Sequence, residues 1–455
     1  YIDNDQRNQR SYLRSGQGRN SNYIVDNLLT YKDGADKHHW TILLGQSTRE
    51  ERWRDTWVSA NDVPQAEEFW YVGQGAQGIG SATGYGEGGL RNAGVSFFTR
   101  GTYDYDNKYL LTATFRADGS SKYQTKWGYF PSVGLGWVIN REKFMEDQSL
   151  FNLLKIRGSW GLLGNDGIQP NAGYGIVNSG NNFSGVFGST GSANGVREPG
   201  YRVGRFFTQV RWEVVEEWDA GLDFALLNNR LEGTVDYYYR QTNDLAFSRP
   251  IPFMWDRVYG NWGSVANSGW EVSLNWKDQV GQFAYKLGAN ATTLNNKVLD
   301  IGALSNIQNG FPEWSAEFPT RIVPNEPINY YYGYEVAGVY QNQAEIAADP
   351  IASAYNQANP GAPIQPGYLR YKDQNSNGEL DEADRINLGN YLPKLTYGFN
   401  IGMSYQKFDL SVALQGVAGN KIHNLNRAMR RKYPQMNADA AFMDNLWTAE
   451  GSTNE

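Results

Sequence analysis

Oxygen-bearing side chains recur at close spacing in the segment DQNSNGELDEAD, which begins at Asp373. Carboxylate, amide and carbonyl oxygens are the ligands that Ca²⁺ prefers, and a loop with this spacing can wrap one ion. Gly378 occupies the sixth position, where such a loop needs a sharp turn. The segment therefore predicts a calcium site. Its predicted ligands are Asp373, Asn375, Asn377, the carbonyl of Glu379, Asp381 and Asp384.

The calcium prediction has an alternative that needs no ion. The last position holds Asp384 instead of the bidentate Glu of a calcium loop, and no pair of helices is apparent on either side. A run of Asp and Asn also forms Asx turns, in which these side chains accept hydrogen bonds from nearby backbone. Both interpretations stay open. Calcium is the candidate cofactor, and no organic cofactor is indicated.

Two other patterns lead away from enzyme chemistry. The string GQGAQG at residues 73–78 has the glycine spacing of a dinucleotide-binding loop, but no strand and helix frame it, so it indicates a flexible loop. The acids Glu213, Glu216, Glu217 and Asp219 could be pictured as paired glycosidase carboxylates, but solvated charges of a barrel lumen or a loop explain them better. No Ser, His and Asp set suggests a nucleophilic site. We therefore expect that the protein is not an enzyme.

The composition excludes several classes of protein. The chain has 455 residues, no Cys, three His, 14% aromatic residues and a formal net charge of -7. Without Cys it has no disulfide framework, zinc ribbon or thiol nucleophile. Its apolar runs are only a few residues long, far below the roughly 20 that a transmembrane helix needs. The negative charge, with one basic run at Arg427–Tyr433, argues against a nucleic acid partner.

Strict alternation of apolar and polar residues is the strongest local signal. Apolar residues from Tyr109 to Phe115 alternate with Thr112, Thr114 and Arg116, as in a half-buried strand. Because the pattern recurs along the chain, we expect an all-β protein of about a dozen strands. The pattern recurs at residues 133–139, 154–162, 222–226, 231–239, 270–276, 283–289, 397–405 and 408–414.

The polar face and the connections favour a membrane barrel over a soluble β-sandwich. The polar face carries Gly, Ser, Asn and mixed charge, as a wet barrel lumen does, and aromatic residues cluster near strand ends like interfacial girdles. Short links alternate with long polar loops, which is typical of outer-membrane barrels. Strand parity then requires one more crossing between Gln341 and Lys394, for which Gly367–Lys372 is the candidate. The short links lie at 33–37, 106–108, 228–230, 278–282 and 406–407, and the long loops at 51–89, 165–205, 246–263 and 301–329.

The ends of the chain suggest an internal piece of a longer protein. Tyr1 is not an initiator Met, no targeting segment follows it, and the chain stops on a polar stretch. An open sheet edge in lipid would leave backbone groups unpaired. We therefore expect a partial transmembrane antiparallel β-barrel over residues 1–455, completed by strands outside this chain.

Several strings are similar to those of the SusC/RagA-like family of TonB-dependent outer-membrane transporters of the Bacteroidota. They follow one another in family order over most of the chain, and together they are specific. They are KYLLTATFRADGSSKY (108–123), GYFPSVGLGW (128–137), LLKIRGSWGLLGN (153–165), the run from Arg211 to Leu245, NSGWEVSL (267–274), GYLRYKDQNSNGELDEADR (367–385) and YGFNIGMSYQKFDLSVALQGVAGNKI (397–422).

The resemblance implies a 22-stranded barrel in the cell outer membrane, with an N-terminal plug domain inside it. It also implies a SusD-like surface lipoprotein that opens like a lid, and energy delivered by TonB. The plug and the TonB box are absent from this chain, and residues 366–390 form a calcium-loop-like insertion in the barrel. The implied function is uptake of a large nutrient ligand, either an oligosaccharide (glycan) or a peptide. The resemblance also implies that outer-membrane lipid surrounds the barrel.

Aromatic residues in the long loops are candidates for contact with such a nutrient, since rings stack on sugars or peptide side chains. Each is more often a loop-packing residue. Two alternatives stay open: a secreted, soluble all-β polysaccharide-binding protein or hydrolase, and a passive porin. The sequence does not identify the substrate. The candidate residues are Trp70, Tyr71, Tyr174, Trp255, Tyr259 and Trp314.

Overall fold

The computed structural model consists mainly of long antiparallel strands. Its helices are short, and none in the described part of the chain has the length and apolar character to cross a membrane. The chain divides into two compact units, residues 1–146, 155–218 and 242–262 in the first and residues 147–154, 219–241 and 263–455 in the second. The structure describes residues 11–64, 66–74, 84–168, 170, 175–187, 196–205, 208–250, 257–302, 307–309, 320–424 and 446–453.

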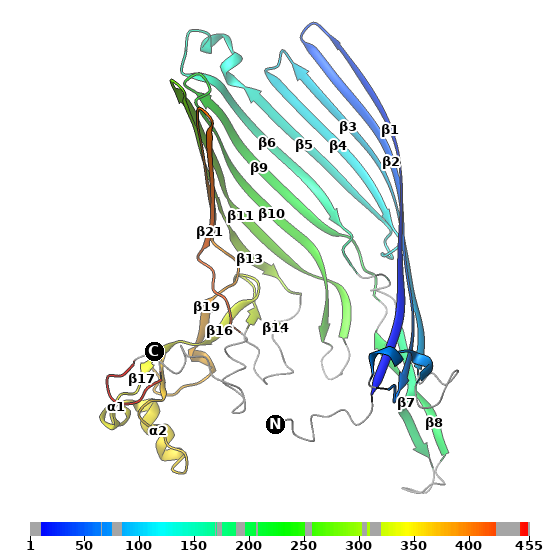
Figure 1. Cartoon of the computed structure of the whole chain (residues 1–455), viewed down its shortest axis with the longest axis vertical. Helices are drawn as coiled ribbons and strands as arrows, with labels where there is room; N and C mark the ends of the chain where they lie inside the picture. The colour runs from blue at the N-terminus through cyan, green and yellow to red at the C-terminus, as the bar shows by residue number, and fades with distance from the viewer. Residues whose placement is uncertain are drawn as a thin grey trace. The chain divides into compact units, whose positions relative to one another are not determined.

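Twelve strands follow one another in the main sheet, in the order β1-β2-β3-β4-β5-β6-β9-β10-β11-β12-β20-β21. Nearly every strand lies beside its neighbour in the chain, as in an up-and-down barrel. Figure 1 shows β1 to β6 side by side, with the β1–β2 turn at the top of the view. The strands are β1 (Tyr12–Ala35), β2 (His38–Asn61), β3 (Gly84–Tyr105), β4 (Tyr109–Ser120), β5 (Trp127–Val138), β6 (Phe151–Asn165), β9 (Glu213–Leu226), β10 (Leu231–Pro250), β11 (Arg257–Val280), β12 (Phe283–Thr293), β20 (Leu395–Tyr405) and β21 (Phe408–Ala418).

The short turns have the backbone geometry that tight hairpins require. Asp106 and Asn107 have φ values of 55° and 51°, and Asn228 and Asn229 have values of 57° and 60°. Asp and Asn tolerate this left-handed region better than most residues, and it matches the twist of the flanking strands. The short links that alternation predicted are therefore confirmed as hairpin turns.

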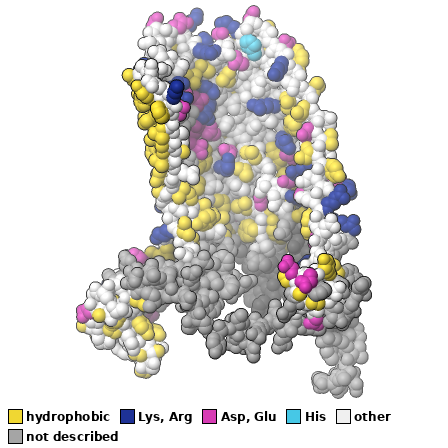
Figure 2. Space-filling view, viewed as in Figure 1, with side chains coloured by type: hydrophobic (Ala, Val, Ile, Leu, Met, Phe, Trp, Pro, Cys, Tyr) yellow, Lys and Arg dark blue, Asp and Glu magenta, His cyan; other side chains and the backbone are white. Residues whose placement is uncertain are grey.

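The two faces of the first unit's strands differ in the way that the alternation predicted. On β4 and β5, Phe115 and Leu135 point to one face and are 47% and 62% exposed. Thr114 and Ser132, which are Cα partners, point to the other. A sheet that exposes its apolar face is expected in lipid. Figure 2 shows Lys and Arg interspersed with Asp and Glu on the face in view.

The proposed extra crossing at Gly367–Lys372 is wrong. Only Leu369–Tyr371 is a strand there (β18), and it pairs with β17 (Val336–Val339) in a separate two-stranded sheet. Three residues span about 10 Å, whereas a transmembrane strand needs about 9–11 residues. No crossing is missing, because β12 pairs directly with β20 in antiparallel register.

The long connection between β12 and β20 holds the small elements of the second unit, and the predicted insertion at residues 366–390 lies within it. β14, β15, β16 and β19 form a four-stranded sheet, and Tyr340, Ile346 and Ala352 form a buried cluster at the helices. The remaining elements are β13 (Asn295–Asp300), β14 (Ile307–Asn309), β15 (Thr320–Ile322), β16 (Tyr330–Tyr334), α1 (Gln343–Ala348), α2 (Pro350–Ala358), the 3₁₀ turn η6 (Glu382–Asp384) and β19 (Arg385–Gly389), with β7 (Ile176–Phe187) and β8 (Val196–Arg205) in the first unit.

Candidate functional site

A cavity of about 790 Å³ lies against the polar face of the first unit. Small hydroxyl and glycine positions form much of its wall, and charged residues of both signs project from it. These residues reach one face because they share the same parity along their strands. The charged lining residues are Arg49, Arg116, Asp118, Asp166 and Glu217, and the hydroxyl residues are Ser47, Ser96, Thr112, Thr114, Ser132 and Ser159.

Arg116 and Asp118, two residues apart on β4, form the first ion pair of the wall. The Arg116 Nε donates to both carboxylate oxygens of Asp118 at 2.7 Å, and its Nη2 donates to the Ser96 hydroxyl at 2.9 Å. The guanidinium also lies 5.3 Å from the ring centroid of Phe98. These contacts fix the orientation of the guanidinium, yet its side chain stays 44% exposed. Arg116 can therefore meet a ligand without a large loss of side-chain entropy.

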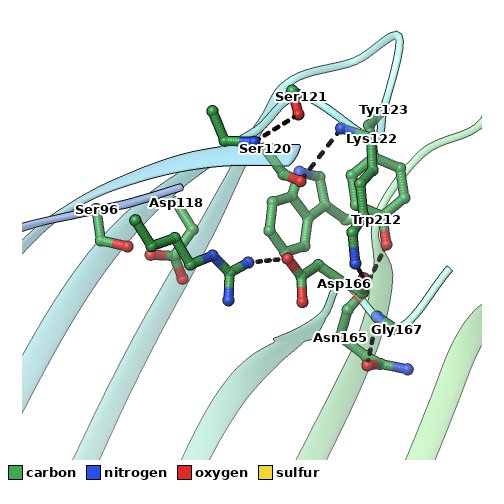
Figure 3. Close-up of polar contacts among 12 residues, drawn as sticks. Ser96, Asp118, Ser120, Ser121, Lys122, Tyr123, Asn165, Asp166, Gly167 and Trp212 are labelled. Atoms are coloured by element: carbon green, nitrogen blue, oxygen red, sulfur yellow. Dashed lines mark hydrogen bonds and ion pairs between the residues drawn. The ribbon is translucent and has the colours of Figure 1, made fainter. Parts of the chain in front are cut away.

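The second ion pair joins Arg49 on β2 to Asp166, just after β6. Asp166 also accepts a hydrogen bond at its backbone carbonyl from the Lys122 Nζ, at 2.9 Å. Figure 3 shows Asp166 between the strand that carries Asp118 and the connection that carries Lys122. Burial lowers the pKa of Lys122, and the nearby charge of Arg49 adds to that effect.

An aromatic cluster supports this end of the wall. The ring of Tyr123 stacks on Trp212 with centroids 4.8 Å apart, and Phe130 meets Trp212 edge-on at 5.5 Å. The Tyr123 hydroxyl donates to the Asn165 carbonyl at 2.6 Å, and the Trp212 Nε1 donates to the Lys126 carbonyl at 3.1 Å. Burial raises the pKa of Tyr123 well above its usual range, so the hydroxyl stays a donor. The cluster ties the β4–β5 connection to the end of β6.

The prediction that the acids between Glu213 and Asp219 are all solvated charges is wrong for Glu213. Glu213 is buried and accepts hydrogen bonds from Asn165 Nδ2 at 2.6 Å and from the Ala246 N–H at 2.9 Å. Glu216 accepts from the indole N–H groups of Trp160 and Trp218, at 3.0 and 3.2 Å. Since neighbouring residues of a strand point to opposite faces, Glu216 and the cavity-lining Glu217 lie on different sides of the sheet.

Few of the predicted loop aromatics fall where their surroundings are described. Trp70 and Tyr71 lie between two 3₁₀ turns, η2 (Glu67–Phe69) and η3 (Val72–Gln74), and are 54% and 67% exposed. Tyr259 packs, partly buried, against the aromatic cluster around Trp212. None of these three lines the cavity. Tyr174, Trp255 and Trp314 lie outside the described residues.

The first half of the predicted calcium loop has the expected turn. The N–H of Gly378 donates to an Asp373 carboxylate oxygen at 2.8 Å, and Gly378 has a φ of +82°. The N–H of Asn377 donates to Asn375 Oδ1 at 3.0 Å and to Asp373 at 3.3 Å. The side-chain oxygens of Asp373 and Asn375 therefore meet at the N–H of Asn377, as in the first half of a calcium loop. The Asn377 side-chain oxygen instead accepts from the Glu379 N–H at 2.8 Å.

The end of the loop is organised differently. Asp384 is buried, and its two oxygens accept from the N–H groups of Gln374 and Asp381, each at 2.9 Å. The bond from the Asp381 N–H is the largest cause of a lowered pKa for Asp384. Asp381 in turn caps η6 through the Ala383 N–H at 2.7 Å. Among the residues described, no group of three or more His, Cys, Asp or Glu is arranged to hold a metal ion. Calcium binding by this loop stays a prediction.

Only part of the cavity wall has a signature in the sequence alone. Arg49 and Asp166 lie outside the strings singled out in the sequence, and their pairing joins β2 to the end of β6, two segments that are distant in the chain. One signal is present, because alternation places Thr112, Thr114 and Arg116 on the polar face of one strand. Following that parity into Asp118 locates one ion pair but not the partner of Arg49.

Comparison with known proteins identifies related chains. A family model described as "TonB dependent receptor-like, beta-barrel" matches residues 1–412. A TonB-dependent receptor of Formosa agariphila is 32% identical over 369 residues, covering 79% of this chain and 35% of that protein. The TonB-dependent receptor SusC of Bacteroides thetaiotaomicron is 29% identical over 353 residues, covering 73% of this chain and 32% of SusC.

A solved structure agrees with the sheet described above. The structure of the RagAB peptide transporter matches with a TM-score of 0.77 at 21% sequence identity, covering 96% of this chain and 46% of that chain. A likeness at this level of identity concerns the fold. The chain spans about a third of the length of the two curated relatives, at 35% and 32%.

Proposed function

The chain belongs to the TonB-dependent receptor-like β-barrel family of the outer membrane, in its SusC/RagA-like branch, and on this basis we propose that the protein actively imports a large nutrient. The cargo is an oligosaccharide or a peptide. TonB supplies the energy, and a SusD-like surface lipoprotein serves as the lid. The protein is not an enzyme; the relatives named above are receptors and a transporter.

The cavity of the first unit is the observation that carries this proposal. Its wall offers hydroxyl groups, two oriented arginines and three carboxylates over a space of about 790 Å³. Such a surface recognises ligands with many hydroxyl or amide groups, because these form hydrogen bonds that replace those made with water. The structurally similar RagAB is a peptide transporter, which favours testing a peptide first.

Uptake in cells tests the transport proposal. A strain that carries the full-length gene with Arg49→Ala and Arg116→Ala should lose growth on the imported nutrient, while the amount of protein in the outer membrane stays the same. The matched control is Lys126→Ala, which removes an exposed charge that does not line the cavity. Normal growth of the double variant would contradict a role for this wall.

Energy dependence separates active import from a passive porin. Deleting TonB should stop uptake by this protein, whereas diffusion through a porin would continue. A SusD-like partner should also co-purify with the detergent-extracted protein. A soluble protein that purifies alone would instead support the secreted polysaccharide-binding protein or hydrolase.

We also propose that the loop from Asp373 to Asp384 binds Ca²⁺ as a structural ion. The oxygens of Asp373 and Asn375, which meet at the N–H of Asn377, support this, whereas the backbone bonds of Asp384 hold the loop even without an ion. Adding Ca²⁺ after chelation should slow hydrogen exchange in the loop. An Asn375→Ala variant should abolish that response, and exchange insensitive to Ca²⁺ in the native protein would rule the site out.

A further inference from the structure

The connection between β5 and β6 differs from the other turns at its end of the sheet. It covers residues 139–150 and contains two 3₁₀ turns, η4 (Ile139–Arg141) and η5 (Lys143–Met145). Its start lies beside the β3–β4 turn, because the N–H of Val138 donates to the Lys108 carbonyl at 2.8 Å. A tight hairpin would have joined the strands as well, so the extra residues are available for another role.

An apolar side chain stands out of this connection, directly after two cations in the sequence. Phe144 is 70% exposed, and Arg141 and Lys143 beside it are exposed as well. A single exposed aromatic needs no explanation on most surfaces. The exposure of Phe144 is explained by its position relative to the apolar face of the sheet.

The connection is tied to that apolar face through Glu142. Its carboxylate accepts hydrogen bonds from the Tyr109 hydroxyl at 2.6 Å and from the Trp137 Nε1 at 3.1 Å. Tyr109 and Trp137 are Cα partners on β4 and β5, and they point to the face that exposes Phe115 and Leu135. Both bonds keep the pKa of Glu142 below its usual range, so the carboxylate is charged at neutral pH.

The exposed apolar face that carries Phe115 and Leu135 is called the apolar band below. The spacing of aromatic residues places Tyr109, to which Glu142 is bonded, at one edge of this band. Tyr109 stacks with Tyr105 at the turn end of β3 and β4, and Phe97 stacks with Trp127 at the other end. Trp127 is the Cα partner of Gly119, ten residues along β4 from Tyr109. Ten residues span about 33 Å of strand, or about 25 Å of height at a tilt near 40°, which is the height of the apolar band in outer-membrane barrels.

We propose that residues 139–146 lie in the lipid–water interface on the turn side of the sheet, with Phe144 inserted among the phospholipid acyl chains. Arg141 and Lys143 then face the headgroup phosphates, as basic residues at membrane interfaces do. The inference rests on the outer-membrane placement of the chain and not on the identity of its cargo.

Lipid fits this surface because the surface continues the apolar band. Glu142 joins the connection to two band residues, Tyr109 and Trp137. β5 lies between β4 and β6 in the sheet, so the connection that follows β5 does not lie at a sheet edge. An aromatic side chain close to basic residues is also a combination that interfacial membrane segments use.

Spin labels test the insertion directly in the full-length protein, reconstituted in phospholipid liposomes. The chain has no Cys, so a single label can be placed at Phe144→Cys, with any cysteines elsewhere in the protein replaced by serine. Labels at Leu135→Cys, on the apolar face, and at Asn228→Cys, in a tight turn, provide the lipid and water references. Collision rates with oxygen and with a water-soluble nickel chelate report which phase surrounds each label.

We expect the Phe144 label to collide with oxygen and to be shielded from nickel, as at Leu135. Nickel access equal to that at Asn228 would overturn the proposal. Low access to both reagents would also overturn it, because that pattern indicates packing against protein.

A second pair of variants tests the anchoring by Glu142. Adding Glu142→Ala to the labelled protein should raise nickel access at Phe144 several-fold, because the connection loses its bonds to Tyr109 and Trp137. Adding Glu146→Ala, which removes an exposed acid of the same connection, should leave it unchanged. Nutrient uptake is measured on the same proteins. If uptake is lost while nickel access at Phe144 does not change, the result bears on the transport proposal and not on the membrane insertion.

Discussion

The cavity wall and the loop from Asp373 to Asp384 both collect charged and amide side chains, but they satisfy them in different ways. In the wall, Arg49 and Asp166 form an ion pair across 117 residues of sequence. In the loop, Asp373 and Asp384 accept bonds from backbone N–H groups no more than ten residues away. The loop therefore stabilises itself locally, whereas the wall exists only once distant strands are paired.

The largest expected effect comes from the aromatic support of the wall. Trp212 is 7% exposed and contacts both Tyr123 and Phe130. Replacing such a residue with Ala costs about 3–5 kcal/mol. Trp212→Ala should therefore lower the temperature at which the detergent-extracted protein unfolds, measured by heat-dependent electrophoretic mobility, and reduce uptake. Trp70→Ala, at a ring that is 54% exposed, should leave the unfolding temperature unchanged, and an equal shift of that temperature in both variants would contradict the account.

The loop should respond locally to loss of its buried acid. Asp384→Ala leaves the N–H groups of Gln374 and Asp381 without their acceptor. Hydrogen exchange in the loop should become roughly tenfold faster or more, because local opening is easier. Exchange in β4 and β5 should not change. Glu379→Ala is the matched control, since the Glu379 side chain is exposed and the predicted ligand there is a carbonyl.

A smaller effect is expected from a single cavity cation. Arg116→Ala should weaken the apparent affinity for the imported nutrient by about tenfold, the scale of a lost hydrogen bond to a charged group. Concentration-dependent uptake measures it. Arg116→Lys should recover only part of the loss, because Lys keeps the charge but not the planar fork that holds Asp118. An affinity unchanged in Arg116→Ala would remove this residue from the site.

The smallest effect is a pH response confined to the loop. The pKa of Asp384 is lower in the folded loop than the 3.8 of a free Asp, chiefly because of the Asp381 N–H. Its contribution to stability is therefore complete above pH 3.8 and is lost as the pH falls through the lowered folded value. Hydrogen exchange in the loop, corrected for its intrinsic pH dependence, should accelerate only at that acidic end. Asp384→Asn should remove the response, and an unaltered response in that variant would assign it to another group.

The contrast between the two regions explains what sequence could predict. Alternation located nine of the twelve strands of the main sheet but not β1, β2 or β3, and the Asx spacing located a turn that forms from its own residues. The partner of Arg49 depends on strand register and on the course of the chain after β6, which no local pattern encodes. The extra crossing at Gly367–Lys372 failed for a related reason, because the direct pairing of β12 with β20 is a long-range feature.

The connection that carries Phe144 illustrates the same limit. Its residues have no repeat or motif, and its role follows only from the bonds that Glu142 makes to Tyr109 and Trp137 on the apolar face. Local sequence can show where strands end. It does not show which face a connection folds against.

The central claim is that imported nutrient passes along the cavity wall, and photo-crosslinking in living cells tests it most directly. A photoreactive amino acid at Ser96, which lines the cavity, should capture an oligosaccharide or peptide that mass spectrometry can identify. The same group at Leu135, on the apolar face, should capture none. Capture of nutrient in equal amounts at both positions would contradict the account. So would a label at Ser96 that crosslinks only to the protein's own chain and to no nutrient.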